Sequence, residues 1–332
     1  MSAYNAVARV AVGVMIVAAA STGTNQFVHS RQAEANLLSA DGPLSGSQTA
    51  LILGGTGQPT PSPELARSAE NLYLNALGFD QGATDSTVCH MDGTDPCSAP
   101  LQVLTTPELF QQGLSSLTGA SDVVLAVQNE FAANPGAFDA EHPLTIFGYS
   151  QSATAESIAM TQLAQAGIPS DDLHFVFIGD PSTPVTGVWS NLVAAADATL
   201  GTSLATKLLD LTGMNVPGVI GSVTPNDLYP ATIYSLPADP VANFQQVFEA
   251  NGLWGALLGI LGPHVEYLGL TPAQVADATT STDGDLTFVN INDSDINNFA
   301  AWTSALLEHG VANSDPLQSV FDSLQLLFTN SY

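Results

Sequence analysis

Residues 144–153 read Leu-Thr-Ile-Phe-Gly-Tyr-Ser-Gln-Ser-Ala, an apolar, β-branched run that passes into small and polar residues. The run predicts a buried strand, and the apolar spacing of residues 153–166 predicts a helix directly after it. A nucleophile elbow is a strained turn between a strand and a helix that holds a reactive serine. It requires small residues two positions before and after the serine, and Gly148 and Ser152 satisfy this requirement around Ser150. We therefore predict a nucleophile elbow, with an ordinary strand-to-helix turn as the alternative.

The composition limits the classes of protein that this chain can belong to. Its 332 residues are 45% hydrophobic and 11% charged, which suits one large α/β domain or two small ones. Only 4 Lys and Arg face 31 Asp and Glu, giving a net charge of -27, so the basic surface that binds nucleic acid is absent. The same charge repels anionic headgroups, so a lipid contact should be apolar.

The N-terminal segment has the pattern of an export signal. Arg9 precedes an apolar run over residues 10–20, which ends in small residues. This run is shorter than the roughly 20 apolar residues of a comfortable membrane-spanning helix, although an uncleaved membrane anchor is the alternative. We expect an export signal or anchor over residues 1–20, a polar linker over residues 21–48, and a location in the cell envelope or outside the cell.

A glycine-rich loop follows the first predicted strand. Residues 54–59 read Gly-Gly-Thr-Gly-Gln-Pro, and further prolines stand at positions 61 and 63. A dinucleotide-binding loop requires a helix that begins at its glycines, and these prolines prevent one. In an α/β-hydrolase the same loop supplies a backbone N–H group to the oxyanion hole. We expect that donor at Gly55 or Thr56, with a second one at Gln151, the residue after the nucleophile.

An elbow serine needs a histidine and an acid, which follow it in α/β-hydrolases in the order serine, acid, histidine. His174, His264 and His309 come after Ser150 in the chain. His174 opens a predicted strand at its wrong end and His309 lies near the C-terminus, so we interpret both as surface or capping residues. His264 follows the last predicted sheet element and is the expected base.

Two aspartates compete for the role of the acid. Asp180 follows the predicted strand at residues 173–178, and Asp239 follows the later one at residues 231–236. Either residue would fix the imidazole tautomer and stabilise its cationic form while the histidine takes the serine proton.

The two cysteines, Cys89 and Cys97, flank a turn-rich segment. In an exported chain an even pair predicts a local disulfide. A zinc site with His90 is the alternative, but crowding in the loop and the export signal argue against it. We expect no metal and no cofactor.

The remaining segments complete the predicted architecture. Residues 189–213 and 244–261 predict helices, and the first of these is either a packed core helix or a lid-like insertion over a lipid site. Residues 271–332 are expected to form a helical extension of the same domain, with solvated acidic loops at 283–285 and 290–295. The predicted fold is a single α/β-hydrolase domain over residues 49–270, with a mainly parallel sheet flanked by helices.

Residues 147–154, Phe-Gly-Tyr-Ser-Gln-Ser-Ala-Thr, resemble the serine motif of the PE-PPE domain hydrolases of mycobacterial envelopes and, more distantly, the G-Y-S-Q-G of cutinases. The likeness extends over about residues 50–270 through five further motifs: Leu-Gly-Gly-Thr-Gly (53–57), Leu-Thr-Thr-Pro-Glu (104–108), Ile-Gly-Asp-Pro (178–181), Ala-Asp-Pro (238–240) and His-Val-Glu-Tyr (264–267). The resemblance implies ester chemistry on lipids and favours Asp239, which lies in the motif that precedes the family's histidine.

Three functions follow from these expectations. The resemblance to exported members implies an enzyme that forms an acyl-Ser150 intermediate and transfers the acyl chain to a trehalose glycolipid acceptor, in contact with the surface of the outer or plasma membrane. A carboxylesterase or lipase that transfers the acyl chain to water is the first alternative. A lipid-binding envelope protein without chemistry is the second.

Overall fold

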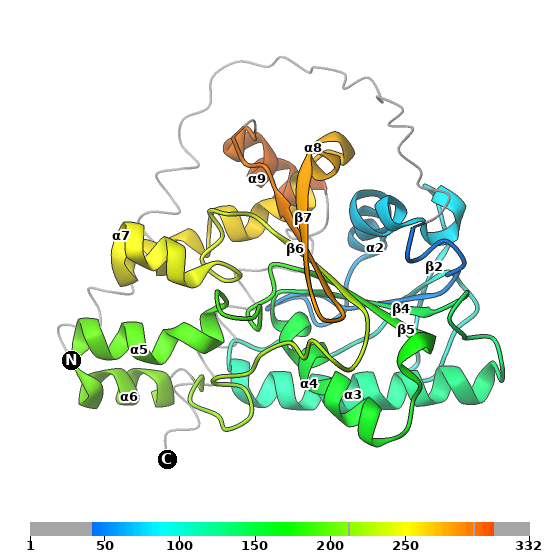
Figure 1. The fold of residues 1–332 in the computed structure, drawn as a ribbon, viewed down its shortest axis with the longest axis horizontal. Coiled ribbons are helices and arrows are strands. Elements are labelled where there is room, and N and C mark those ends of the chain that lie inside the picture. Colours follow the sequence, from blue (N-terminus) through cyan, green and yellow to red (C-terminus); the bar gives the residue numbers. More distant parts are fainter. Residues whose placement is uncertain (1–41, 212, 295, 309–332) are drawn as a thin grey trace. The chain divides into compact units, whose positions relative to one another are not determined.

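The computed structural model describes residues 42–308 except 212 and 295 (Figure 1). The predicted export signal or anchor, most of the predicted linker, His309 and the rest of the predicted extension after it lie outside the described residues. Among the helices that the structure does describe, none is both long and apolar enough to cross a bilayer.

A single eight-stranded sheet organises the described residues. Its order is β2-β3-β1-β4-β5-β6-β8-β7, and every neighbouring pair is parallel except β7 with β8. This mainly parallel sheet flanked by helices confirms the predicted fold class (Figure 1). The strands are β1 Ala50–Ile52, β2 Val88–His90, β3 Leu101–Val103, β4 Leu144–Tyr149, β5 Leu173–Ile178, β6 Ala231–Ser235, β7 Ala278–Asp283 and β8 Leu286–Ile291.

Helices cover both faces of the sheet because successive side chains of each buried strand point to opposite faces. Ile146 of β4 packs with the helices α3 and α4 on one face, while its neighbour Phe147 packs with α2, α8 and α9 on the other. The bounds are α2 Pro63–Ala69, α3 Gln112–Ala133, α4 Gln151–Gln165, α5 Val188–Leu200, α6 Thr202–Leu211, α7 Phe244–Gly259, α8 Pro272–Ala276 and α9 Asn298–Glu308. Short helical turns are η1 Glu70–Leu74, η2 Asn75–Leu77, η3 Phe79–Gly82, η4 Ser170–Asp172 and η5 Pro263–Gly269.

The helices α5, α6 and α7 share a third apolar cluster beside the sheet. The helical structure predicted over residues 189–213 is present as α5 and α6. Trp189, at the start of α5, is buried, and its indole N–H donates to the Thr154 hydroxyl of α4 at 2.8 Å. The start of α5 is therefore fixed to the core, next to the helix that follows Ser150.

Two expectations about the secondary structure are wrong. Residues 278–291, expected within a helical extension with an acidic loop, form the hairpin β7–β8. Strand β7 is rich in Thr and mostly exposed, so it lacks the apolar alternation that indicates a strand. Residues 42–48 are no linker, because Leu44 is fully buried in the core. Residues 104–111 precede α3 without helix, and Glu108 there has a φ of 42°.

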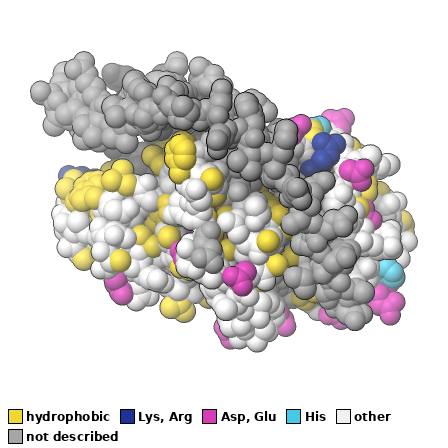
Figure 2. Space-filling view, turned by 90° about the horizontal axis from the view of Figure 1, so that it is seen from above, with side chains coloured by type: hydrophobic (Ala, Val, Ile, Leu, Met, Phe, Trp, Pro, Cys, Tyr) yellow, Lys and Arg dark blue, Asp and Glu magenta, His cyan; other side chains and the backbone are white. Residues whose placement is uncertain are grey.

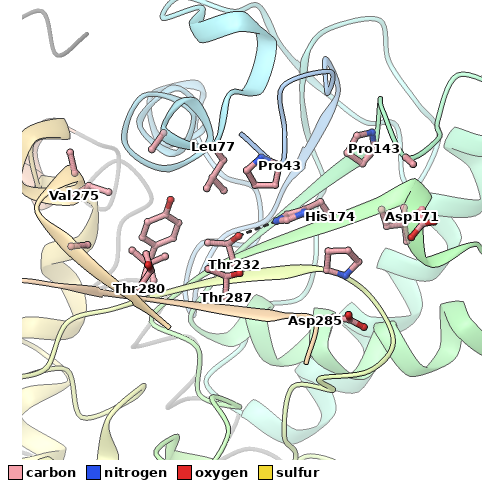
Figure 3. Close-up of a pocket in the computed structure, with 18 residues that line it drawn as sticks. Pro43, Leu77, Pro143, Asp171, His174, Thr232, Val275, Thr280, Asp285 and Thr287 are labelled. Atoms are coloured by element: carbon pink, nitrogen blue, oxygen red, sulfur yellow. Dashed lines mark hydrogen bonds between the residues drawn. The ribbon is translucent and has the colours of Figure 1, made fainter. Parts of the chain in front are cut away.

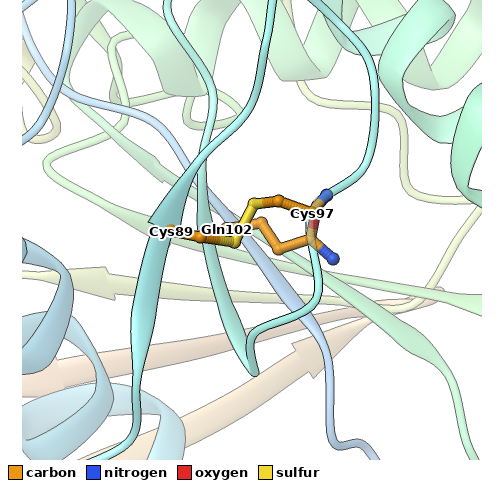
Figure 4. The surroundings of a disulfide bond; sticks show 3 residues. All are labelled: Cys89, Cys97 and Gln102. Atoms are coloured by element: carbon orange, nitrogen blue, oxygen red, sulfur yellow. A yellow bond between two sulfur atoms is a disulfide. The ribbon is translucent and has the colours of Figure 1, made fainter.

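The predicted disulfide between Cys89 and Cys97 is present (Figure 4). It joins β2 to the segment that leads into β3, at the edge of the sheet. The Gln102 side chain accepts the backbone N–H of Cys97 at 2.9 Å, which holds the same loop. Because the two sulfur atoms are bonded to each other, they are not free to bind zinc.

Candidate active site

Ser150 lies between the end of β4 and the start of α4, in the strained backbone that an elbow requires. Its φ is 58° and its ψ is -115°, values that side-chain-bearing residues rarely adopt. A Cβ atom on Gly148 would lie 2.6 Å from Glu156 Oε1, so glycine is needed there. Ser152 is fully buried, and its hydroxyl accepts the N–H of Tyr149 at 2.9 Å and donates to its carbonyl at 3.1 Å.

The structure brings the predicted serine, histidine and acid together. Nε2 of His264 lies 2.8 Å from the Ser150 Oγ. Nδ1 of the same ring lies 3.0 Å and 3.1 Å from the two carboxylate oxygens of Asp239. Ser150 is half-buried, whereas His264 and Asp239 are buried. A continuous chain of hydrogen bonds therefore runs from a buried carboxylate to an accessible hydroxyl.

Parallel strands explain this convergence of residues that are distant in the sequence. Ser150 follows β4, Asp239 follows β6, and His264 opens η5 after α7. The carboxyl ends of parallel strands meet at one edge of a sheet, which is the usual site of chemistry in such folds. Between them, Gly179 follows β5 with a φ of 58°, and a Cβ there would approach the His264 ring to 2.8 Å.

Tyr267 completes the surroundings of the acid, and the sequence reasoning missed it. Its hydroxyl donates to Asp239 Oδ2 at 2.8 Å and accepts the N–H of Leu236 at 2.9 Å. The N–H of Val241 donates to Oδ1 at 2.8 Å. Burial, with the nearby Asp239 charge, raises the pKa of Tyr267, so its hydroxyl keeps its proton. The sequence signal that could have pointed to Tyr267 is its spacing of three residues from His264, which is one turn of a 3₁₀-helix.

Asp180, the alternative acid, has other partners. Its carboxylate accepts the N–H of Ser182 at 2.8 Å and the hydroxyl of Thr224 at 2.7 Å. Burial raises its pKa to about 6. Among the described hydrogen bonds of Asp180, none reaches His264, so the geometry joins the histidine to Asp239.

The expected oxyanion donors lie beside Ser150. The Gly55 backbone is close, since a Cβ there would lie 3.3 Å from the Cβ of Ser150. Its own N–H points to Gln58 Oε1 at 3.4 Å. In the described part of the chain, no group accepts the backbone N–H of Thr56 or of Gln151, which is the first residue of α4. These two N–H groups are the available donors.

The side chains of the same two residues are tied to the start of α3. Gln112 donates from Nε2 to the Thr56 hydroxyl at 2.8 Å, and Gln151 donates from Nε2 to the carbonyl of Leu109 at 2.9 Å. The N–H of Gly57 donates to the carbonyl of Glu108 at 2.7 Å. The glycine loop is thus held against the elbow from the side of α3.

Two buried glutamates lie near the elbow. Burial raises the pKa of Glu108 to about 8, although the Thr106 hydroxyl donates to its Oε1 at 2.8 Å. Glu156 is fully buried on α4, neither of its oxygens has a hydrogen-bond partner, and its pKa lies well above the ordinary value. Burial is the main cause, and the nearby acids Glu108 and Asp180 add to it. Within the described residues, no group of His, Cys, Asp and Glu side chains could hold a metal ion.

A pocket of about 580 Å³ lies away from this site, near the amino ends of β5 and β6 (Figure 3). Its lining includes His174, whose Nε2 lies 3.0 Å from the Thr232 hydroxyl, and none of the predicted site residues. Burial lowers the pKa of His174 to about 4. The expectation of a surface or capping residue is therefore wrong for His174, because the strand that it opens is covered on this face by Pro43 and Leu77.

The sheet and these contacts define an α/β protein with a hydrogen-bonded serine, histidine and aspartate at the carboxyl edge of its strands. The PE-PPE domain matches residues 97–289, more than half of the chain, and the chain therefore belongs to the PE-PPE domain family.

Similar proteins from Mycobacterium tuberculosis (strain ATCC 25618 / H37Rv) include the uncharacterized PPE family protein PPE28, 29% identical over 70% of this chain and 31% of its own length. The esterase PE16 of the same strain is 29% identical over 76% of this chain and 43% of its own length. This chain thus spans less than half of either relative. A solved cutinase-like protein from Cryptococcus sp. is 18% identical over 68% of this chain and 98% of its own, at a TM-score of 0.32, a superposition too loose to bear on the fold.

Proposed function

We propose that this protein is a serine acyl-transfer enzyme that takes an acyl chain from a lipid ester onto Ser150. The observation that carries the proposal is the hydrogen-bonded chain from Ser150 through His264 to Asp239. A serine hydroxyl is a weak nucleophile until a base takes its proton, and His264 Nε2 is within reach to do so. Asp239 holds the proton on Nδ1 and stabilises the ring once it is cationic.

The reaction proceeds in two halves. Ser150 Oγ attacks the ester carbonyl, its proton passes to His264 Nε2, and the oxyanion that forms accepts the N–H groups of Gln151 and Thr56. Each such donor contributes on the order of 3 kcal/mol to the transition state. His264 then gives the proton to the departing alcohol, which leaves the acyl-serine ester. In the second half the ring takes the proton of the acceptor hydroxyl while the acceptor oxygen attacks the acyl carbonyl. The bond from the acyl carbon to Ser150 Oγ then breaks, and the ring returns the proton to Oγ.

For the acceptor, we propose a sugar hydroxyl of a trehalose glycolipid ahead of water. Support comes from the apolar helices α5 and α7 beside the site, since exclusion of water lets an alcohol compete for the acyl group. The name of the relative PE16, an esterase, supports the hydrolytic alternative. The disulfide fits an exported protein that works on envelope lipids.

A fluorophosphonate probe tests the proposal at its centre. We expect covalent labelling of the wild-type protein at Ser150, with none in Ser150→Ala. If the wild type takes up no label, while both proteins bind lipid equally, the chain is a lipid-binding protein without chemistry.

A second experiment identifies the acceptor. Wild type and Ser150→Ala are incubated with an acyl-trehalose donor and an excess of acceptor glycolipid, and the products are read by mass spectrometry. We expect the acceptor to gain acyl chains and the release of free fatty acid to fall. If fatty acid is released at the same rate with and without the acceptor, and the acceptor gains no acyl chain, the protein is an esterase or lipase.

A further inference from the structure

The most exposed large hydrophobic side chains of the described residues gather at one edge of the sheet. Leu204 of α6, at 56% exposed, is left out of this group, whose six members are each more than half exposed: Leu114, Val185, Trp254, Leu258, Leu261 and Phe299, from 57% to 75%. We call them the apolar rim. They lie on segments that follow the carboxyl ends of β3, β5, β6 and β8, which are the ends that also carry Ser150 and Asp239.

Contacts tie each part of the rim to the candidate site. Leu261 precedes His264 by three residues. The Trp302 indole of α9 donates to the carbonyl of Leu261 at 2.9 Å, which brings α9, and with it Phe299, close to Leu261. Next to Val185, Thr186 donates to the carbonyl of Ala242, in the loop that holds the acid. Leu114 lies two residues after Gln112, which binds Thr56. These contacts place the segments that carry the rim next to the candidate site.

The segments that bear the rim are almost free of charge. Residues 104–121, 181–196, 250–265 and 296–305 contain no Lys or Arg, and their one acidic residue, Glu108, is buried. Asp122, Asp197 and Glu249 lie on the same helices just outside these segments, and the rest of the chain supplies most of the net charge of -27. In Figure 2, hydrophobic side chains gather toward the left, the side of α5 and α7 in Figure 1, while most acidic ones lie to the right and along the lower edge.

We propose that the apolar rim docks this protein onto a lipid surface without net charge and so delivers an ester to Ser150. Exposed apolar groups on an otherwise acidic molecule gain by entering a lipid layer, whereas an anionic layer would repel the rest of the chain. Trp254 and Leu258 lie four residues apart on one side of α7, and tryptophan favours the boundary between lipid and water. The inference rests on the proposed function for its substrate class alone.

Sedimentation with vesicles tests the docking directly. We expect wild type and Ser150→Ala to bind phosphatidylcholine vesicles equally. Inclusion of about a third phosphatidylglycerol should weaken binding, and added salt should restore it by screening the repulsion. The double variant Trp254→Ser/Leu258→Ser should bind neutral vesicles roughly tenfold or more weakly. Leu125→Ser on α3, 49% exposed and outside the rim, is the matched control and should bind like wild type.

The outcomes separate the docking surface from the chemistry. Thermal unfolding shows whether each variant has folded, and fluorophosphonate labelling of the wild type reports on the chemistry independently. Vesicle binding without labelling would contradict the proposed function and leave the docking surface standing. Labelling without vesicle binding, equal losses in the rim and control variants, or a stable dimer that buries the rim would overturn the docking proposal.

Discussion

Tyr267 places a third donor on the Asp239 carboxylate, in addition to the His264 ring and the N–H of Val241. We predict that Tyr267→Phe lowers kcat by roughly tenfold with little change in KM, because the carboxylate becomes free to rotate away from the ring. The variant also leaves the N–H of Leu236 buried without a partner, a cost of about 1–3 kcal/mol in unfolding free energy.

Tyr229→Phe is the matched control for that loss of a hydroxyl. Tyr229 is buried as well, and its hydroxyl donates at 2.9 Å to the carbonyl of Ile168, remote from the site. We expect it to lower stability without lowering kcat. Equal falls in kcat for the two variants would show that Tyr267 acts on the fold alone.

Glu108 should make stability fall as the pH rises. Its pKa is raised from 4.5 to about 8 in the folded protein, so below pH 4.5 both states hold the proton and no difference arises. Between pH 4.5 and pH 8 the unfolded chain ionises while the folded one does not, which favours unfolding. Glu108→Gln cannot titrate, so it should gain about 3 kcal/mol over wild type between pH 5 and pH 8.

Denaturant unfolding of wild type and Glu108→Gln at both pH values measures this gain. The exposed Glu141→Gln is the control for the loss of one negative charge. Parallel stability profiles for wild type and Glu108→Gln would contradict the prediction.

Single residues differed in how far the sequence revealed them. Ser150 was found because an elbow is a local motif, with its strand, turn and helix adjacent in the chain. His264 and Asp239 followed from their order after the serine and from the resemblance. Tyr267 stands in the motif at residues 264–267, but its contact with the acid did not follow from it, because Asp239 is 28 residues away and the two meet only once α7 has folded between them.

At the level of elements, removal of the disulfide tests whether the stability of the sheet edge at β2 affects the candidate site. Cys89 and Cys97 are eight residues apart, and closure of so short a loop stabilises a fold by about 2–3 kcal/mol. We predict that Cys89→Ser/Cys97→Ser loses about this much stability and still takes the fluorophosphonate label at Ser150. The reason is that β3 and β1 lie between β2 and the serine strand.

Chemical denaturation and the labelling rate measure the two effects separately. Loss of labelling in a variant that stays folded at the assay temperature would show that the edge and the site are coupled.

The longer buried strands were predicted, whereas the three-residue buried strand β3 and the exposed strand β7 were not. Strands β4 and β5 are apolar at nearly every position because both of their faces are covered. Strand β7 has one neighbour and mostly exposed side chains, so hydrophobicity left no trace of it. Its pairing with β8 depends on a turn at Gly284, which has a φ of 58° and lies within residues interpreted as an acidic loop.

For the whole molecule, the imbalance between 31 acidic and 4 basic residues should make stability depend on salt. Raising NaCl from about 10 mM to about 1 M shortens the screening length from about 30 Å to about 3 Å and relieves the repulsion. We expect Tm to rise by roughly 3 °C or more at neutral pH. The rise should vanish near pH 4.1, the isoelectric point, and a rise of equal size there would contradict this explanation.

The 114 residues that separate Ser150 from His264 have a consequence for biosynthesis. Translation at roughly 5–20 residues per second leaves an interval of roughly 6 to 20 seconds in which the nascent polypeptide has its nucleophile but no base. During that interval the serine is chemically inert, because an unassisted hydroxyl does not attack esters at a useful rate. Under the proposed function, the unfinished chain therefore cannot damage the lipids of the cell that makes it.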